Sequence, residues 1–364
     1  MPGTAARAVG RILVTIVSAL AGTPAAAGDA VLVREFVYDA APYPEAHAST
    51  IVETRDGNLA AAWFGGTRER NPDVSIWFAR HEGGRWQTPV RVADGVQADG
   101  TRQPTWNPVL FQDPAGDLLL FYKVGPTPRD WWGMVMRSDD GGRSWGPPRR
   151  LPDGILGPIK NKPVILADGA WLAPSSVEQV VGVLAGEGAP SWRIHFERSA
   201  DRGRTWSRTP PVASPFLIDA IQPSILFHGD GVLQAIARSR QGAMATSWSY
   251  DDGRTWSDIA ALALPDPNSG ADALTLADGR HLVVYNHAAH DPRTPGKGPR
   301  HPLVVALSDD GIAWRRALTL EQAPLEHGYA YPAVIQAGDG RVHVTYTHDR
   351  HRIRHVVLDP RRLE

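Results

Sequence analysis

The sequence predicts an all-β fold, a six-bladed β-propeller whose blades are four-stranded antiparallel sheets. Two repeated motifs and the composition point to this fold. The 364 residues include 36 Gly, 31 Pro and 13 Trp, a mixture that suits many short strands and tight turns better than helices. A chain of this length can bury a large core, either as two ordinary domains or as one large all-β domain.

The first motif is an apolar run, a turn centred on Asp-Gly or a near equivalent, and then an alternating apolar run. Asp-Gly between such runs is a strong β-hairpin signal. Six copies, each roughly 50 to 60 residues from the next, imply six similar units of about four strands. A radial arrangement of such units leaves few exposed edges. The turns are Asp56-Gly57, Gly116-Asp117, Asp168-Gly169, Asp230-Gly231, Asp278-Gly279 and Asp339-Gly340. We expect the strand near residues 31–37 to close the ring beside the last blade.

The second motif, Ser-x-Asp-x-Gly-x-Ser/Thr-Trp, is interleaved with the first. In it, Ser and Asp side chains can satisfy turn amides, Gly allows a positive φ, and Trp packs back onto the sheet. We therefore interpret it as structural. It occurs at residues 138–145, 199–206 and 249–256, in shortened form at 308–314, and as a remnant at 83–86.

These boxes resemble the Asp boxes of the sialidase (neuraminidase) superfamily, whose domain is a six-bladed propeller. The resemblance covers nearly the whole chain after residue 27. It is specific for the fold and less so for the activity, because Asp boxes also occur in propellers with other chemistry.

Composition and charge exclude several other classes of protein. The formal charge of -1 argues against a nucleic-acid binder, which normally has a basic excess. Cysteine is absent, which excludes a disulfide framework, a thiolate zinc site and a cysteine nucleophile.

Residues 1–27 have the features of a signal peptide. Arg7 and Arg11 give a positive start, an apolar run covers residues 12–21, and Ala25-Ala26-Ala27 fits an A-x-A cleavage site. The apolar run is about half of the ~20 residues needed to cross a bilayer. We expect an exported protein, periplasmic or extracellular, with residues 28–364 as the propeller and no membrane span after cleavage. An uncleaved membrane anchor is the alternative.

Polar residues recur just before the first motif of each blade, where the inner strands of a propeller start around its axis. The ends of the same strands and the loops after them add further charges. Together they predict a polar pocket for an anionic ligand, with Asn107 and Lys162 among the substrate-binding residues. The first set is Glu45, His47, Arg102, Trp106, Asn107, Lys160, Asn161, Lys162, Asp219, Gln222, Asn268, Ser269, Asp272, Glu326, His327, Tyr329 and Tyr331. The second set is Arg68, Arg70, Asp73, Lys123, Glu178, Arg238, Arg240, His287, Arg300 and Arg350.

The resemblance implies a grip on a substrate carboxylate by three arginines, since a guanidinium fork matches a carboxylate bidentately. Arg238, in the run Ala-Arg-Ser-Arg that ends at Arg240, resembles the second, and Arg300 resembles the third. The first normally begins an Arg-Ile-Pro motif, where this chain has His47. A protonated His47 could meet a carboxylate, or the imidazole could act as an acid or base. Arg68 resembles a further arginine of the family.

The resemblance also implies catalytic roles. Asp73 matches the family's acid/base residue, which protonates the leaving oxygen and later deprotonates water. Tyr329 falls on the nucleophilic tyrosine, with Tyr331 as the other candidate; a tyrosine avoids the repulsion that a carboxylate nucleophile would meet. Asp219 would take the proton of the tyrosine, and Gln222 occupies the alternative alignment for this role.

We therefore expect an exported glycoside hydrolase, similar to exo-α-sialidases, that releases a terminal acidic sugar from a glycan or glycoconjugate without a metal or other cofactor. One alternative keeps the fold but makes the protein a lyase or hydrolase of uronic-acid glycans such as rhamnosyl-glucuronate, with His47 or Tyr329 as the base in the lyase. Another is a glycan-binding propeller without catalysis.

Overall fold

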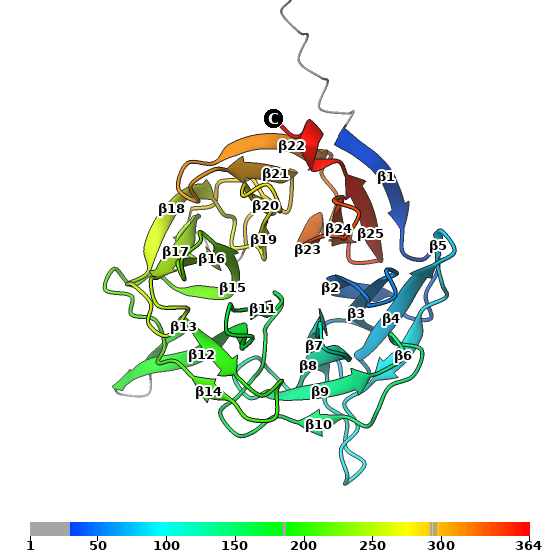
Figure 1. Ribbon diagram of the computed structural model, residues 1–364. Helices are drawn as coiled ribbons and strands as arrows, with labels where there is room; N and C mark the ends of the chain where they lie inside the picture. The colour runs from blue at the N-terminus through cyan, green and yellow to red at the C-terminus, as the bar shows by residue number, and fades with distance from the viewer. Residues whose placement is uncertain (1–29, 185–186, 292, 294–296) are drawn as a thin grey trace, which may run out of the picture.

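The computed structural model describes residues 30–184, 187–291, 293 and 297–364. Its strands form six antiparallel sheets arranged around a common axis (Figure 1), which confirms the predicted six-bladed propeller. The predicted signal peptide, residues 1–27, lies outside the described residues. Within them, no helix is long and apolar enough to span a membrane.

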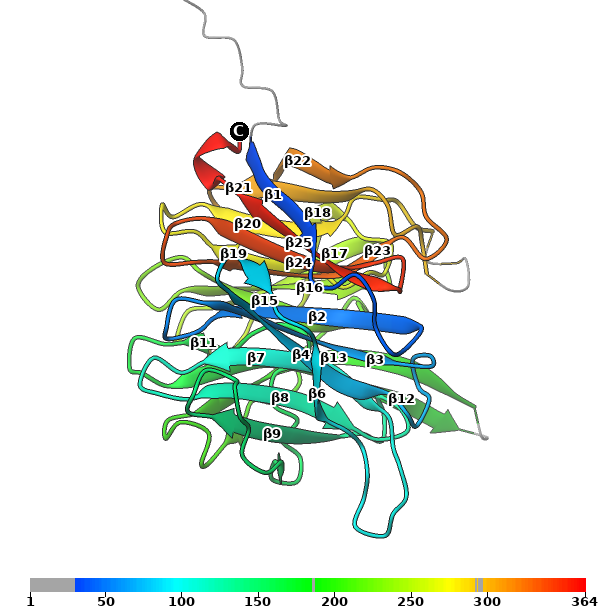
Figure 2. The same cartoon turned by 90° about the vertical axis from the view of Figure 1, so that its right-hand side faces the viewer.

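Blades 1 to 5 are each built from consecutive strands, beginning with the innermost. Blade 1 comprises β2 (Glu45–Glu53), β3 (Leu59–Gly66), β4 (Ser75–Glu82), β5 (Arg85–Trp86) and β6 (Val90–Ala93), of which the last two both pair with β4. Blade 2 comprises β7 (Thr105–Gln112), β8 (Leu118–Val124), β9 (Trp132–Ser138) and β10 (Arg149–Arg150). Blade 3 comprises β11 (Val164–Ile165), β12 (Trp171–Leu184), β13 (Glu187–Ser199) and β14 (Ser207–Arg208). The hairpin of β12 and β13 projects from one face of the ring (Figure 2).

The remaining strands complete the ring. Blade 4 comprises β15 (Ala220–Phe227), β16 (Leu233–Ser239), β17 (Ala243–Ser249) and β18 (Ala260–Pro265). Blade 5 comprises β19 (Asp272–Thr275), β20 (His281–Asn286), β21 (Leu303–Ser308) and β22 (Arg315–Glu321). Blade 6 comprises β23 (Tyr329–Gln336), β24 (Val342–His348), β25 (Arg352–Leu358) and, as its outer strand, β1 (Val31–Phe36). A short 3-10 helix, η2 (Pro360–Arg362), follows β25.

The first strand closes the ring, as the sequence predicts. β1 pairs antiparallel with β25, so that Glu35 lies opposite His355. The Glu35 carboxylate accepts hydrogen bonds from the imidazole of His355 at 2.9 Å and from Trp86 Nε1 of blade 1 at 3.1 Å. The two ends of the chain are thereby joined to each other and to the first blade.

The core is divided among the spaces between blades. Strand faces of neighbouring blades pack against each other; Leu282 and Val305 of blade 5, for example, meet Val334 and Val344 of blade 6. Similar apolar clusters fill the other interfaces. Each blade thus buries both of its faces, which explains why the middle strands have nearly continuous apolar sequences.

The Asp boxes have the predicted structural role in blades 2 to 5. In the box of blade 3, Ser199 Oγ donates to Asp201 Oδ1 at 2.9 Å, and Asp201 accepts from the backbone N–H and hydroxyl of Thr205 at 2.8 and 2.6 Å. Gly203 has φ +79°, and a Cβ there would lie 2.9 Å from the ring of Trp171. The box therefore needs glycine for its backbone conformation and for its close packing.

Candidate functional site

A left-handed residue lies at the start of each inner strand or just before it. The six have φ between 40° and 66°. Four of them coincide with register shifts in β2, β7, β15 and β23, and such bulges change the direction of a side chain. The six residues are Ala48, Asn107, Lys160, Gln222, Asn268 and Tyr331. Gln222 and Lys160 reach Tyr331 from blades 4 and 3, so these side chains meet near the axis of the ring.

Tyr331 is the centre of this group. Its hydroxyl accepts hydrogen bonds from Arg238 Nη1 at 2.8 Å and from Gln222 Nε2 at 3.4 Å. The ring of His47 lies 4.3 Å from that of Tyr331, centroid to centroid. Burial opposes ionisation of the phenol, but the charges of Arg238 and Lys297 outweigh it and lower the pKa of Tyr331. These cations therefore make the phenolate, the nucleophilic form of tyrosine, easier to form than it is for a free tyrosine.

Cations surround Tyr331, and two of them have N–H donors without a hydrogen-bond partner in the described chain. Arg300 donates from Nη2 to the carbonyl of Asn268 at 3.2 Å. Its Nη1 and the Nε of Arg238 are buried and have no hydrogen-bond partner within the described chain. Burial, together with the charge of Arg238, lowers the pKa of Arg300 to about 10. Buried polar groups are normally paired, so these two donors indicate a place for an acceptor such as a carboxylate.

The surroundings of His47 disfavour its protonated form. It is 4% exposed, and its Nδ1 lies 3.0 Å from the hydroxyl of Thr347. Burial and the charges of Arg350, Lys297 and other cations hold its pKa well below the usual range. A cationic role for His47 in the free protein is therefore disfavoured, whereas an acid/base role remains open to its neutral form.

A cavity of about 370 Å³ lies on the same face of the ring and contains Arg68. Across it, Arg350 Nη1 forms an ion pair with Glu69 Oε2 at 2.7 Å. Burial raises the pKa of Glu69, but Arg350 and Lys297 outweigh this effect and lower it overall. Glu69 acts electrostatically on Tyr331 as well. The cavity is lined by Glu45, Arg68, Glu69, Arg70, Lys297, His327 and Arg350.

Sequence reasoning missed Glu69 and Lys297. Glu69 lies on the loop between β3 and β4 that also carries Arg68 and Asp73, so the sequence pointed to this loop but not to Glu69. Asp73 instead accepts hydrogen bonds from the backbone N–H and hydroxyl of Thr67 at 2.9 and 2.7 Å. Those bonds close the loop on which Glu69 stands.

Two other predicted residues point elsewhere. Tyr329 packs in the core between blades 5 and 6, with its ring 5.3 Å from that of His348 and 6.3 Å from that of Tyr346. Asp219 accepts hydrogen bonds from the backbone N–H of Trp192 at 3.0 Å and from Arg193 Nη1 at 3.1 Å. The structure therefore does not bring Asp219 to either tyrosine.

The remaining substrate-binding candidates are spread along the channel. Asn107 is buried at the bulge of β7. Arg240 and Arg238 lie over the ring of Trp192, at 4.1 and 4.9 Å from its centroid. Lys162 lines a separate cavity of the channel, and its Nζ forms a 2.6 Å ion pair there with Asp272.

No group of three or more His, Asp or Glu side chains in the described part of the chain is arranged to hold a metal ion.

Comparison with known families identifies the chain. The sequence profile of the BNR repeat-like domain matches residues 57–344, which is most of its length. The chain belongs to this family. None of the curated protein sequences compared with it matches.

Solved structures show the same fold at low sequence identity. A protein of unknown function from Dyadobacter fermentans has a TM-score of 0.71 and 18% identity, covering 90% of this chain and 98% of its own. The NanB sialidase from Streptococcus pneumoniae has a TM-score of 0.67 and 14% identity, and the match covers 91% of this chain and 71% of the sialidase. The intramolecular trans-sialidase from Ruminococcus gnavus has a TM-score of 0.67 and 12% identity, and the match covers 90% of this chain and 97% of the trans-sialidase. These likenesses confirm a sialidase-like propeller.

Proposed function

We propose that this chain is a glycoside hydrolase that binds a terminal acidic sugar by its carboxylate and attacks the sugar with Tyr331. The observation that carries the proposal is the 2.8 Å hydrogen bond from Arg238 to the Tyr331 hydroxyl, within a group of cations that have free donors. Arg238 and Arg300 would hold the carboxylate, with Arg350 in the place of the missing first arginine. Residues 1–27 support export of the enzyme.

The reaction would proceed in two steps. Tyr331 Oη attacks the anomeric carbon, the glycosidic C–O bond breaks, and the leaving oxygen takes a proton from Glu69. A water molecule then attacks the glycosyl–tyrosine bond, gives its proton to Glu69, and releases the sugar and Tyr331. Glu69 must be protonated for the first step. A substrate carboxylate near Arg350 would weaken the Arg350–Glu69 pair and raise the pKa of Glu69 toward this state.

The residue beside the Tyr331 hydroxyl is Gln222, and not the acidic residue that the resemblance leads us to expect there. Its amide contacts the Tyr331 hydroxyl at 3.4 Å, but an amide cannot take the proton of the phenol. In this proposal the surrounding cations stabilise the phenolate that forms when the phenol gives its proton to water, in place of a carboxylate base beside the tyrosine.

The same observation favours a lyase as the second candidate. A uronate carboxylate held by the arginines would acidify the neighbouring C5–H. Neutral His47 or the Tyr331 phenolate would remove that proton, the C4–O bond would break, and a C4=C5 double bond would form as the leaving oxygen is protonated. In this reaction no covalent intermediate forms.

The test measures release of fluorophore from an α-sialoside beside near-ultraviolet absorbance on a glucuronate glycan. For the hydrolase, Tyr331→Phe abolishes release and Tyr329→Phe, the matched control, retains it. Absorbance that grows on the glucuronate glycan without sialoside turnover would replace the hydrolase with the lyase. Binding of both glycans with turnover of neither would leave a glycan-binding propeller. Loss of activity in Tyr329→Phe but not Tyr331→Phe would overturn the assignment of the nucleophile.

A further inference from the structure

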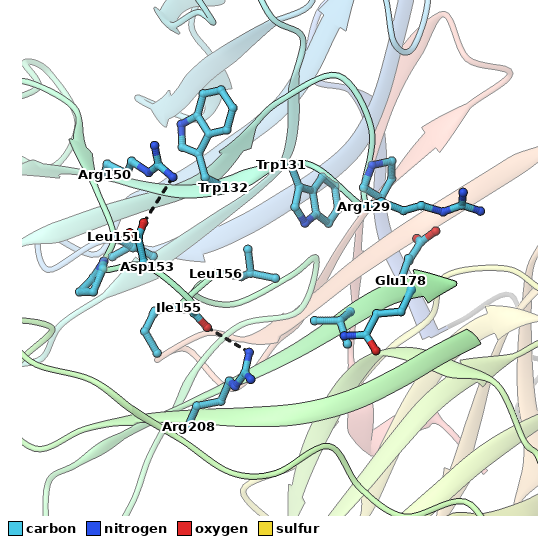
Figure 3. Close-up of a pocket in the computed structure, with 15 residues that line it drawn as sticks. Arg129, Trp131, Trp132, Arg150, Leu151, Asp153, Ile155, Leu156, Glu178 and Arg208 are labelled. Carbon is cyan, nitrogen blue, oxygen red and sulfur yellow. Dashed lines mark hydrogen bonds and ion pairs between the residues drawn. The ribbon is translucent and has the colours of Figure 1, made fainter. Parts of the chain in front are cut away.

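A second cavity, of about 240 Å³, lies between blades 2 and 3 (Figure 3). Its walls come from the loop between β8 and β9, the segment after β10 and the middle of β12. These are the blade positions that supply Glu69 in blade 1 and Arg238 in blade 4, so the cavity opens on the face that carries Tyr331. The cavity lies outside the group of residues assigned above to carboxylate binding.

Two tryptophans supply flat aromatic surface to this cavity. Trp131 and Trp132 are both half-buried, and Arg150 covers the ring of Trp132 at 5.2 Å. Leu151 and Ile155 add apolar surface. Flat rings beside a few polar groups suit a pyranose, which has one face of C–H groups and a rim of hydroxyls.

Two of the three arginines of the cavity are engaged by other groups of the protein. Arg150 is paired with Asp153 at 3.4 Å, and Arg208 donates to the carbonyl of Gly154 at 3.1 Å. Arg129 and Glu178 lie together at the other end (Figure 3). Within the described chain, the Glu178 carboxylate has no hydrogen bond or ion pair. The Glu178 carboxylate and the Arg129 guanidinium thus offer an acceptor and a donor for sugar hydroxyls.

Aromatic rings connect this cavity to the candidate active site. The ring of Trp131 lies 5.9 Å from that of Trp106, which lies 6.4 Å from that of Phe64. Phe64 lies 5.5 Å from His47, which stands 4.3 Å from Tyr331. Four ring-to-ring contacts, with centroid separations of 4.3 to 6.4 Å, thus lead from Trp131 to Tyr331. A short oligosaccharide can span the distance between these two residues.

We propose that the cavity lined by Trp131, Trp132 and Glu178 binds a neutral sugar of the same glycan whose acidic end lies against Tyr331. This inference rests on the proposed function, and it makes the substrate an oligosaccharide rather than a single acidic sugar on an arbitrary group. The subsite contributes affinity for the part of the chain that leaves.

Turnover of two substrates tests the proposal. In Trp131→Ala and Trp132→Ala, kcat/KM for sialyl-lacto-N-tetraose falls about tenfold, because each variant removes an aromatic anchor from the subsite. The value for an aryl sialoside, which lacks downstream sugars, stays the same. Trp248→Ala, which removes another half-buried tryptophan on blade 4, changes neither. Equal losses on both substrates, or no loss on the longer one, would overturn the subsite.

Calorimetric titration with neutral lacto-N-tetraose and cellotetraose separates this proposal from the proposed function. The full chain should bind at least one of them, and Trp132→Ala should lose that binding even if no substrate is turned over. Binding without turnover would mean that the hydrolase is wrong and the subsite stands. If neither tetrasaccharide binds, or if binding survives in both tryptophan variants, the subsite is wrong whatever the activity.

Discussion

The two ends of the central channel use charge in opposite ways. At one end, Arg238 and Arg300 retain buried donors without partners in the described chain. At the other, Asp272 accepts hydrogen bonds from Lys162 at 2.6 Å, from Ser224 Oγ at 2.9 Å and from the backbone N–H of Val334 at 2.9 Å. These partners come from blades 3, 4 and 6, so one carboxylate of blade 5 joins four blades.

The two ends of the channel thus differ in what their charges do: one set can bind a ligand, and the other stabilises the fold. A charge whose partners are all supplied by the protein stabilises the ring and has little left for a ligand. A charge with an unused donor costs stability, and it persists where a ligand can supply the partner. The two ends should therefore respond differently to mutation, the first in activity and the second in stability.

The largest expected effect is on kcat/KM, from a substitution at the end of the channel that holds Arg238 and Arg300. Arg238→Met removes the donor to Tyr331 and one arm of the carboxylate grip, so kcat/KM should fall by about 10³-fold with little change in the free energy of unfolding. Steady-state kinetics and urea unfolding of the same samples measure both. Arg341→Met, on an exposed loop, is the control. A large loss of stability with unchanged kcat/KM would reverse the assignment of the two ends.

The next effect distinguishes the two carboxylates of the β3–β4 loop. Glu69→Gln should lower kcat by about 10²-fold, since general acid catalysis typically contributes at least this much, whereas Asp73→Asn should change kcat little. An activated leaving group, which needs no proton, should restore much of the activity of Glu69→Gln. Restoration in Asp73→Asn instead would make Asp73 the acid.

Asp272→Asn tests the second end. The variant leaves Lys162 without its counter-charge and removes an acceptor from Val334 N–H, so the free energy of unfolding should fall by about 3 kcal/mol. Urea unfolding gives the value, and Asp153→Asn, at a side chain 94% exposed, should change it by less than about 0.5 kcal/mol. A normal unfolding midpoint with lost activity would show that this end also belongs to the site.

The smallest effect concerns pH and His47. Burial first, and then the neighbouring cations, hold the pKa of His47 below that of the unfolded chain. As pH falls below about 6.5, the unfolded state gains a proton that the folded state does not, so stability decreases by at most about 1.4 kcal/mol per pH unit for this residue. His47→Asn should reduce the slope of unfolding free energy between pH 6.5 and 5. An unchanged slope would mean that His47 is already protonated in the fold.

The candidate site could be predicted only in part. Arg238 and Arg300 come from different blades, yet the repeat spacing was enough to bring both to one end of the channel. Lys162 was expected at the same end because it lies just before the inner strand of blade 3, but its side chain is paired with Asp272. Glu69 and Asp73 could not be separated, since a loop without regular alternation gives no rule for which side chain faces inward.

The ring, its six blades and its turns follow from local sequence, because the Asp boxes and Asp-Gly hairpins are stabilised by bonds within a few residues. Which tyrosine faces the channel follows from tertiary packing. In a regular strand, Tyr329 and Tyr331 would point to the same side. The register of β23 shifts between Ala330 and Ala333, and Tyr331 has φ +52°. This bulge turns Tyr331 toward Arg238 and leaves Tyr329 in the core, an outcome that depends on how blade 6 packs against its neighbours rather than on the local pattern of residues.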